Sequence, residues 1–439
     1  MKKILLASAL LAATLQAGIA QTKSEAAIRQ SIESAREAAA NPKKNTKVAT
    51  WLKLAQAYSD AYQFSKGNGW TGASQQEMQL LSQEKPIAVE DVVLQGQQYR
   101  KEVYPTHNYY FNANGVLQII EVTKFIDDVD PLQLALEAYA GGAAVDAGGS
   151  KTKEMVAGIE AINNNYIDAA YADYTTGNFS NGSLNFEKAA KALASVPCSK
   201  IDSASIYNAG FLAWLGKDYA RARDFFARSL EIGYYAEDGE AYAKLADTYG
   251  NLSQPENQKS LLEEGFTRFP QSQSILVGLI NYYISSGDKS NRIFELLDEA
   301  KKNEPTNASL YYVEGNIHEK LGEYEAAEAA YSRCSEINPE YEYGYIGAGV
   351  MFYNKALKLQ NAANEEMDNA KFDALIAEFN AALKACVPCF EKAFEVTKDN
   401  DIKGSVAEYL KNACFRFRDE PEYQALYDKY SQFVANSGK

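Results

Sequence analysis

The stretch YYVEGNIHEKLGEYEAAEAAYSRCSEINP, residues 311–339, decides the fold of this chain. It is one copy of a pattern that recurs about every 34 residues from Tyr242 onward. The prolines that close successive copies, Pro270, Pro305 and Pro339, are spaced by 35 and 34 residues. Glycine and alanine occupy the positions at which two helix backbones must approach closely, because larger side chains would force the helices apart. The period predicts tandem helical hairpins that share one elongated core.

An earlier copy of the pattern is interrupted. Trp51, Leu54, Ala55 and Tyr58 have the W-x2-L-small-x2-Y spacing of the first helix of such a hairpin. The helix that should pair with it begins only after residues 65–130, at an aspartate followed by a proline, which is a typical helix start. We therefore expect the first hairpin to be split by an insertion.

The insertion has a different periodicity. Tyr109-Tyr110-Phe111 and the apolar run 116–122 are separated by Asn112-Ala113-Asn114-Gly115, and this pattern predicts a β-hairpin. Because an isolated two-stranded hairpin is only marginally stable in water, we expect it to pack on the helices or to pair with residues 89–94 as a small sheet.

The predicted order of segments follows from these boundaries. It begins with a signal peptide (1–20), a capping helix (21–45) and the split first hairpin (46–150), which contains the insertion at 65–130. Tandem hairpins (151–340), an elongated hairpin (341–399) and two capping helices (400–439) follow. Capping helices are expected because an open end of a repeat array exposes its core.

The N-terminus predicts export. Lys2 and Lys3 precede an apolar run at 4–15, and small residues at 18 and 20 favour cleavage before Gln21. No cysteine stands at the new N-terminus, so a lipid anchor is not indicated. No later apolar run is long enough for an integral membrane segment. We expect a periplasmic protein that associates with the outer membrane only through partners.

The charge of the chain excludes one class of partner. The formal net charge is −14, and loss of Lys2 and Lys3 takes it to −16. A chain this acidic, with no basic run, repels phosphate backbones. Nucleic acid is therefore not an expected partner.

With these features, the chain resembles exported tetratricopeptide-repeat (TPR) proteins of the Gram-negative cell envelope. The resemblance includes YNAG at 207–210, FEKAFEV at 390–396 and the split first repeat. It implies an all-α TPR solenoid, a right-handed superhelix of helical hairpins, with a small β-hairpin insertion in the first repeat. It also implies a non-catalytic scaffold or envelope assembly factor without a cofactor, which binds protein or peptide partners on its concave side.

Projection of that concave side onto this chain gives an aromatic-rich groove. TPR domains that grip a peptide C-terminal carboxylate need Lys, Arg and Asn side chains converging in the groove, because a buried carboxylate must be paired. Here tyrosine dominates, which offers a large, rigid contact area with a polar tip. The projected groove residues are Tyr207, Phe211, Trp214, Asp247, Tyr282, Tyr312, Asn316, Tyr343 and Tyr353.

Only one motif suggests reactivity, Cys386-Val387-Pro388-Cys389. A C-x-x-C at a helix start can lower a thiol pKa and cycle between dithiol and disulfide. Such redox sites usually lie in a βαβ setting, which is not predicted here. We interpret Pro388 as the first-turn proline of a helix and both cysteines as packing residues. The total of five cysteines is odd, so at least one is expected to stay free or to pair between chains.

The sequence indicates no metal site and no enzyme. His107 and His318 are too few for a histidine-rich zinc site, and the run Asp127-Asp128-Val129-Asp130 lacks the glycine and distal glutamate of an EF-hand. Capping of a helix by Asp130 explains that run. Nucleotide-binding and serine-hydrolase motifs are absent from the sequence.

Two alternatives to partner binding stay open. Aromatic faces also stack on sugars, so the protein could be a glycan- or small-molecule-binding envelope protein. It could also be a thiol-redox protein that uses the C-x-x-C motif. The contact surface could be the insertion at 65–130 or the concave groove.

Overall fold

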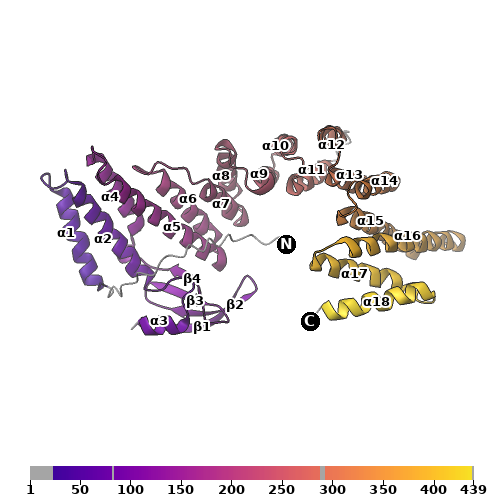
Figure 1. Ribbon diagram of the computed structural model, residues 1–439, viewed down its shortest axis with the longest axis horizontal. Helices are drawn as coiled ribbons and strands as arrows, with labels where there is room; N and C mark the ends of the chain where they lie inside the picture. The colour runs from indigo at the N-terminus through magenta and orange to yellow at the C-terminus, as the bar shows by residue number, and fades with distance from the viewer. Residues whose placement is uncertain (1–22, 82–83, 287–291, 438–439) are drawn as a thin grey trace. The chain divides into compact units, whose positions relative to one another are not determined.

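The computed structural model describes residues 23–81, 84–286 and 292–437 (Figure 1). The chain divides into two compact units, with the boundary between Tyr234 and Tyr235. The predicted signal peptide, residues 1–20, lies outside the described residues.

Unit 1 holds helices and one antiparallel sheet. Its helices are α1 (Glu25–Ala40), α2 (Val48–Lys66), α3 (Gln75–Leu81), α4 (Pro131–Val145), α5 (Thr152–Thr176), α6 (Phe179–Ala194), α7 (Ser203–Leu215) and α8 (Tyr219–Glu231), with a short 3₁₀ turn, η1 (Ile126–Asp128). Its strands are β1 (Ala88–Leu94), β2 (Gln97–Val103), β3 (His107–Phe111) and β4 (Leu117–Val122).

Helices α2 and α4 pack against each other although α3 and the whole sheet lie between them in sequence. Tyr58 of α2, Ala135 of α4 and Met155 of α5 belong to one buried cluster. Close approach of α2 and α4 depends on Gly141, since a Cβ atom there would lie 2.5 Å from the Trp51 ring. The Trp51 indole in turn donates a hydrogen bond from Nε1 to the Asn45 carbonyl, 2.8 Å away.

The insertion is larger than the hairpin that the sequence predicts. The strands β3 and β4 correspond to that hairpin, but β2 and β1 continue it into a four-stranded antiparallel sheet in the order β1-β2-β3-β4. The two-residue turn between β1 and β2 has positive φ at Gln95 (50°) and Gly96 (80°). This is the geometry that two-residue hairpin turns require, although Gln95 is not a typical residue for it. Prediction missed β2 because its sequence, QQYRKEV, is mostly polar.

Each face of the sheet packs against helices. Tyr99, Tyr110 and Ile119 on one face are buried with Ala172 of α5. The other face buries Phe111 and Leu117 with residues that include Met78 of α3. Apolar contacts on both faces hold the insertion to the helices.

His107 of β3 is buried inside the insertion, with 2% of its surface exposed. Its ring stacks on Tyr104 at a centroid distance of 4.7 Å and contacts the Tyr109 ring at 4.4 Å. The Tyr109 hydroxyl accepts a hydrogen bond from the Gly69 amide, 2.8 Å away. Burial lowers the pKa of His107 to about 4, because the charged imidazolium would be poorly solvated there.

Unit 2 consists of consecutive helices. They are α9 (Glu240–Asn251), α10 (Pro255–Arg268), α11 (Gln273–Ser286), α12 (Arg292–Asn303), α13 (Ala308–Leu321), α14 (Tyr324–Ile337), α15 (Glu342–Glu365), α16 (Asn369–Val396), α17 (Asn400–Phe415) and α18 (Pro421–Ser437), preceded by the 3₁₀ turn η2 (Glu237–Gly239).

Helices α13 and α14 form the hairpin of the stretch 311–339. Gly315 lies where they touch, because a Cβ atom there would be 2.5 Å from the Tyr331 ring. Tyr331 is fully buried, and its hydroxyl donates to Asn316 Oδ1 at 2.7 Å. Helix α13 ends at Gly322, whose φ of 81° is the left-handed conformation that glycine adopts without strain.

Helices α15 and α16 are the longest pair of unit 2. The C-x-x-C motif lies well inside α16, so the prediction that Pro388 occupies the first turn of a helix is wrong. Nineteen residues of α16 precede Pro388, and the packing of Phe390 and Cys386 against α15 and α17 holds the helix together through the proline.

Candidate binding surfaces

The nine projected groove residues are divided between the two units. Three lie on α7 of unit 1, namely Tyr207, Phe211 and Trp214. Six lie on α9, α11, α13 and α15 of unit 2, namely Asp247, Tyr282, Tyr312, Asn316, Tyr343 and Tyr353.

The α7 aromatics form a ladder that enters the core. Tyr207 is buried, with 8% exposed, and its ring lies 5.5 Å from the Phe226 ring of α8. Phe211 stacks on Tyr207 at 6.4 Å and on Trp214 at 6.0 Å, and both Phe211 and Trp214 are half-buried. Burial therefore gives Tyr207 a packing role within unit 1, and only the outer two aromatics remain partly accessible.

A cluster of three tyrosines lies at the α13–α15 junction of unit 2, and we call it the tyrosine cluster. The Tyr312 ring lies 5.7 Å from that of Tyr343 and 6.5 Å from that of Tyr341, and the last two are 5.3 Å apart. Tyr343 is 38% exposed. Tyr341 was missed by the projection because it precedes the first turn of α15, although its position just before a repeat's first helix was visible in the sequence.

The other projected residues are not part of this cluster. Tyr282 is buried, with 8% exposed, and its ring contacts Tyr283 at 5.5 Å. The Tyr353 ring meets that of Tyr409 edge-on at 5.1 Å, within the core of α15 to α17. Asp247 is exposed and accepts a hydrogen bond from Asn251 at 3.1 Å. Tyr282 and Tyr353 thus serve mainly packing.

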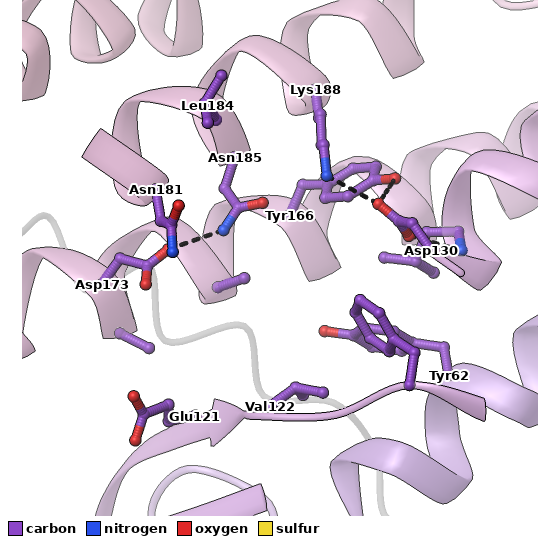
Figure 2. Close-up of a pocket in the computed structure, with 14 residues that line it drawn as sticks. Tyr62, Glu121, Val122, Asp130, Tyr166, Asp173, Asn181, Leu184, Asn185 and Lys188 are labelled. Atoms are coloured by element: carbon purple, nitrogen blue, oxygen red, sulfur yellow. Dashed lines mark hydrogen bonds and ion pairs between the residues drawn. The ribbon is translucent and has the colours of Figure 1, made fainter. Parts of the chain in front are cut away.

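A concave surface lies in unit 1, between the sheet and helices α2, α4, α5 and α6, and we call it the sheet–helix trough. Two openings of ≈ 250 Å³ and ≈ 460 Å³ share the lining residues Tyr62, Val122, Ala169 and Ala172. The larger opening is within the volume range of ordinary ligand sites. Figure 2 shows Glu121 and Val122 on strand β4 facing helices α5 and α6 across the smaller opening. This surface was not predicted from the sequence, because the residues that line it are far apart along the chain.

At one end of the trough lies Asp130, a carboxylate whose charge is neutralised by Lys188. The side chain of Asp130, the N-cap of α4, accepts hydrogen bonds from the Tyr166 hydroxyl and from Lys188 Nζ, each at 2.9 Å (Figure 2). Lys188 also lies over the Tyr166 ring, 5.5 Å from its centroid. The capping role predicted for Asp130 is confirmed by its hydrogen bond from the Leu132 amide, 3.1 Å away.

The other end holds two carboxylates that receive hydrogen bonds only from neutral groups. Asn185 Nδ2 donates to Asp173 at 2.8 Å, while Asn108 Nδ2 and the Tyr110 hydroxyl donate to Glu121 at 2.7 and 2.6 Å. Burial is the main reason that the pKa of Asp173 is raised to about 6; the nearby charge of Glu121 adds to the rise, while the Asn185 hydrogen bond and the charge of Lys188 oppose it.

The C-x-x-C cysteines do not lie in a reactive environment. All five cysteines lie within the described residues and are free there. Cys386 is fully buried, which raises the pKa of its thiol well above the usual range, and burial raises the pKa of Cys389 to about 11. Because the thiolate is the reactive form, these environments oppose thiol chemistry.

Metal sites and membrane-spanning helices are two further kinds of functional feature. Within the described part of the chain, no group of three or more His, Cys, Asp or Glu side chains is arranged to hold a metal ion. Among the described helices, none is both long enough and apolar enough to span a membrane.

Comparison with known proteins agrees with the repeat pattern. Residues 308–341, which include α13 and α14, match the tetratricopeptide repeat family. This hairpin is thus similar to a tetratricopeptide repeat. A TPR repeat-containing protein of Methanocaldococcus jannaschii, MJ1428, is 23% identical over 73% of this chain, and the chain spans about half the length of that protein.

Solved TPR structures also match. A TPR repeats protein of Bacteroides fragilis has 17% identity over 62% of this chain and 99% of its own, with a TM-score of 0.25. A tetratricopeptide repeat protein of Parabacteroides merdae has 13% identity over 56% of this chain and 98% of its own, with a TM-score of 0.32.

Proposed function

We propose that this protein is a non-catalytic, exported scaffold or adaptor that binds a protein or peptide partner through the tyrosine cluster. TPR proteins generally mediate protein–protein or peptide interactions. The observation that carries the proposal is the group Tyr312, Tyr341 and Tyr343, which joins the repeat of residues 308–341 to the following helix α15 and includes an exposed ring. The right-handed winding of the repeats and the location in the periplasm belong to the same proposal.

The chemistry of the cluster suits partner binding. Tyrosine rings offer apolar contact area and a hydroxyl, and they lose little conformational entropy when they bind. The three rings already contact one another, so much of their order exists before a partner arrives. Buried tyrosine anchors are typical hot spots of interfaces.

The first experiment places a photo-crosslinking phenylalanine analogue at position 343 in the native cell, with position 325 as the control. Glu325 is exposed on α14, the helix that directly precedes the one that carries Tyr343. A protein captured at 343 and absent at 325 is then purified, and its affinity is measured by calorimetry. Tyr343→Ala should weaken that affinity at least about tenfold, as expected of a hot spot, while Glu325→Ala leaves it within about twofold. Equal capture at both positions, or unchanged affinity of Tyr343→Ala, would contradict the proposal.

Export has a separate test. Fractionation of the native cells should place the protein in the periplasm, and N-terminal sequencing should begin at Gln21. Recovery in the cytoplasm with residues 1–20 still attached would refute export without bearing on the tyrosine cluster.

A further inference from the structure

Strand β4 has an open edge. It is the last strand in the sheet order, so only one of its sides pairs with β3. Its first residue, Leu117, uses the outer side, donating to the Ala73 carbonyl and accepting from the Gly72 amide, each at 2.8 Å. Directly after the strand, the Thr123 amide donates to the carbonyl of Thr106, the residue that precedes β3, at 2.8 Å. The Thr123 amide therefore points towards β3.

Strand geometry then fixes which backbone groups face outward. Successive residues of an antiparallel strand direct their N–H and C=O groups alternately to the two sides. Because the Thr123 amide points towards β3, the backbone N–H and C=O groups of Val122 and Ile120 point away from β3. Both are only half-buried, and within the described part of the chain the loop that pairs with Leu117 does not reach them. These residues line the trough, so a second strand has free donors and acceptors to pair with.

The walls of the trough carry more negative than positive charge. Its carboxylates are Glu121, Asp130, Asp168 and Asp173, and its cations are Lys66 and Lys188. The lysines are engaged, since Lys188 pairs with Asp130 at 2.9 Å and Lys66 lies 3.7 Å from Asp168.

Glu121 and Asp173 are the two carboxylates of the trough that are left without a lysine partner. Among the described residues, neither has a Lys or Arg nitrogen within ion-pair distance, and their hydrogen-bond donors are amides and a phenol. Glu121 shares its face of β4 with Ile119, which packs on Ala172, the neighbour of Asp173. A cationic group between these two carboxylates would be stabilised by both.

We propose that the sheet–helix trough binds an extended peptide segment of a partner protein, which hydrogen-bonds to Ile120 and Val122 and places one lysine or arginine side chain between Glu121 and Asp173. Main-chain pairing supplies affinity in such strand addition, and the side-chain pocket supplies specificity. The aromatic rings of Tyr62 and Phe125 line the same opening and can contact the aliphatic stem of the basic side chain.

This site is independent of the tyrosine cluster, since its residues all belong to unit 1 and the cluster belongs to unit 2. Loss of one site therefore leaves the other testable. A neutral saccharide would also fit the volume, but it would leave the two carboxylates without a cation.

The test selects binders from a displayed library of random ten-residue peptides on the purified protein. Selected peptides should share one Lys or Arg at a fixed position and lack proline beside it. Each is then synthesised with a fluorescent label, and its affinity is measured for wild type and variants. Asp173→Asn should weaken binding tenfold or more, and replacement of the basic residue by norleucine should cost a similar factor.

Two further variants separate the charge from the strand edge. Glu160→Gln removes a carboxylate from the same helix α5 outside the trough, and it should change affinity by less than twofold. Val122→Pro removes an outward N–H of the edge strand, a position at which proline is tolerated, and it should also weaken binding tenfold or more. If Val122→Pro fails to fold, hydrogen exchange on wild type replaces it, and bound peptide should slow the Ile120 and Val122 amides at least tenfold.

Several outcomes would overturn the inference. They are a selection without binders, binders that lack a basic residue, an affinity that Asp173→Asn leaves unchanged, or protection outside β4. Saccharide binding lost in Asp173→Asn without any peptide binding would assign the trough to a glycan. Self-association of the purified protein that Val122→Pro abolishes would assign it to a second copy of the chain. Tyr343→Ala should leave peptide binding at the trough intact.

Discussion

The tyrosine cluster of unit 2 and the sheet–helix trough of unit 1, the two surfaces proposed here for partner binding, have different origins. The cluster comes from Tyr312 and Tyr343, which lie on first helices of neighbouring hairpins and are therefore related by the repeat period. The trough comes from an insertion that folds back against α5 and α6. The surface built by the repeats is aromatic and tightly packed, whereas the surface built by the insertion is acidic and includes two carboxylates, Glu121 and Asp173, without a direct ion pair among the described residues. Packing therefore constrains the tyrosine cluster more than it constrains the trough.

The largest expected effect tests how rigidly the repeat is packed. Gly315→Leu should destabilise unit 2 by more than about 3 kcal/mol, because even a Cβ atom there lies 2.5 Å from the Tyr331 ring. The measurement is denaturant unfolding of the variant beside Gly404→Leu. Gly404 of α17 has open space around its Cβ position, so that control should lose little. Similar stability of the two variants would show that α13 and α14 are not packed as described.

The next effect concerns the pH dependence of the insertion. The folded pKa of His107 is about 4, below its ordinary value of 6.5, so the unfolded chain binds more protons between these pH values. The contribution of His107 to stability is therefore complete above pH 6.5 and falls as the pH drops towards 4, by roughly 2 to 3 kcal/mol. NMR titration of the His107 ring, assigned with His107→Gln, should give the low pKa directly. Titration near 6.5 would contradict the buried environment.

A smaller effect of opposite sign is expected in the trough. The folded pKa of Asp173, about 6, lies above its ordinary value of 3.8, so the folded state holds its proton more tightly. Stability from this group is present below pH 4 and is lost as the pH rises towards 6. Asp173→Asn should therefore stabilise unit 1 at pH 7, by about 1 kcal/mol once partial solvent screening is included. Thermal melting beside Glu160→Gln checks this, and a lower melting temperature for Asp173→Asn would mean that its carboxylate serves the fold.

The smallest effect is expected at the exposed tyrosine. Tyr343→Ala should change the stability of unit 2 by less than about 0.5 kcal/mol, because its ring is 38% exposed. The matched comparison is Tyr331→Ala in the same region, where truncation of a fully buried ring should cost about 3 to 5 kcal/mol. If both substitutions cost the same, Tyr343 belongs to the core and the tyrosine cluster is not a contact surface.

The sequence predicted the helical repeats because they depend on local periodicity. The glycines and alanines that let helices touch recur at a fixed spacing, so one clear copy at 311–339 was enough to place the match of residues 308–341. The β3–β4 hairpin was predicted for a similar reason, since its turn residues and alternation lie within one short stretch.

Tertiary structure decided what local patterns could not. Strand β2 is polar, and its pairing with β1 and β3 determines its conformation. Packing determines the burial of Tyr207 and Tyr282, because the sequence shows which helix a tyrosine is on but not how closely its neighbours approach. The opposition of Glu121 and Asp173 joins a strand and a helix that are 52 residues apart in sequence, so their electrostatic interaction exists only in the folded chain. Sequence thus determined the repeats through short-range periodicity, and folding alone determined the acidic trough, because non-local contacts set burial and charge proximity.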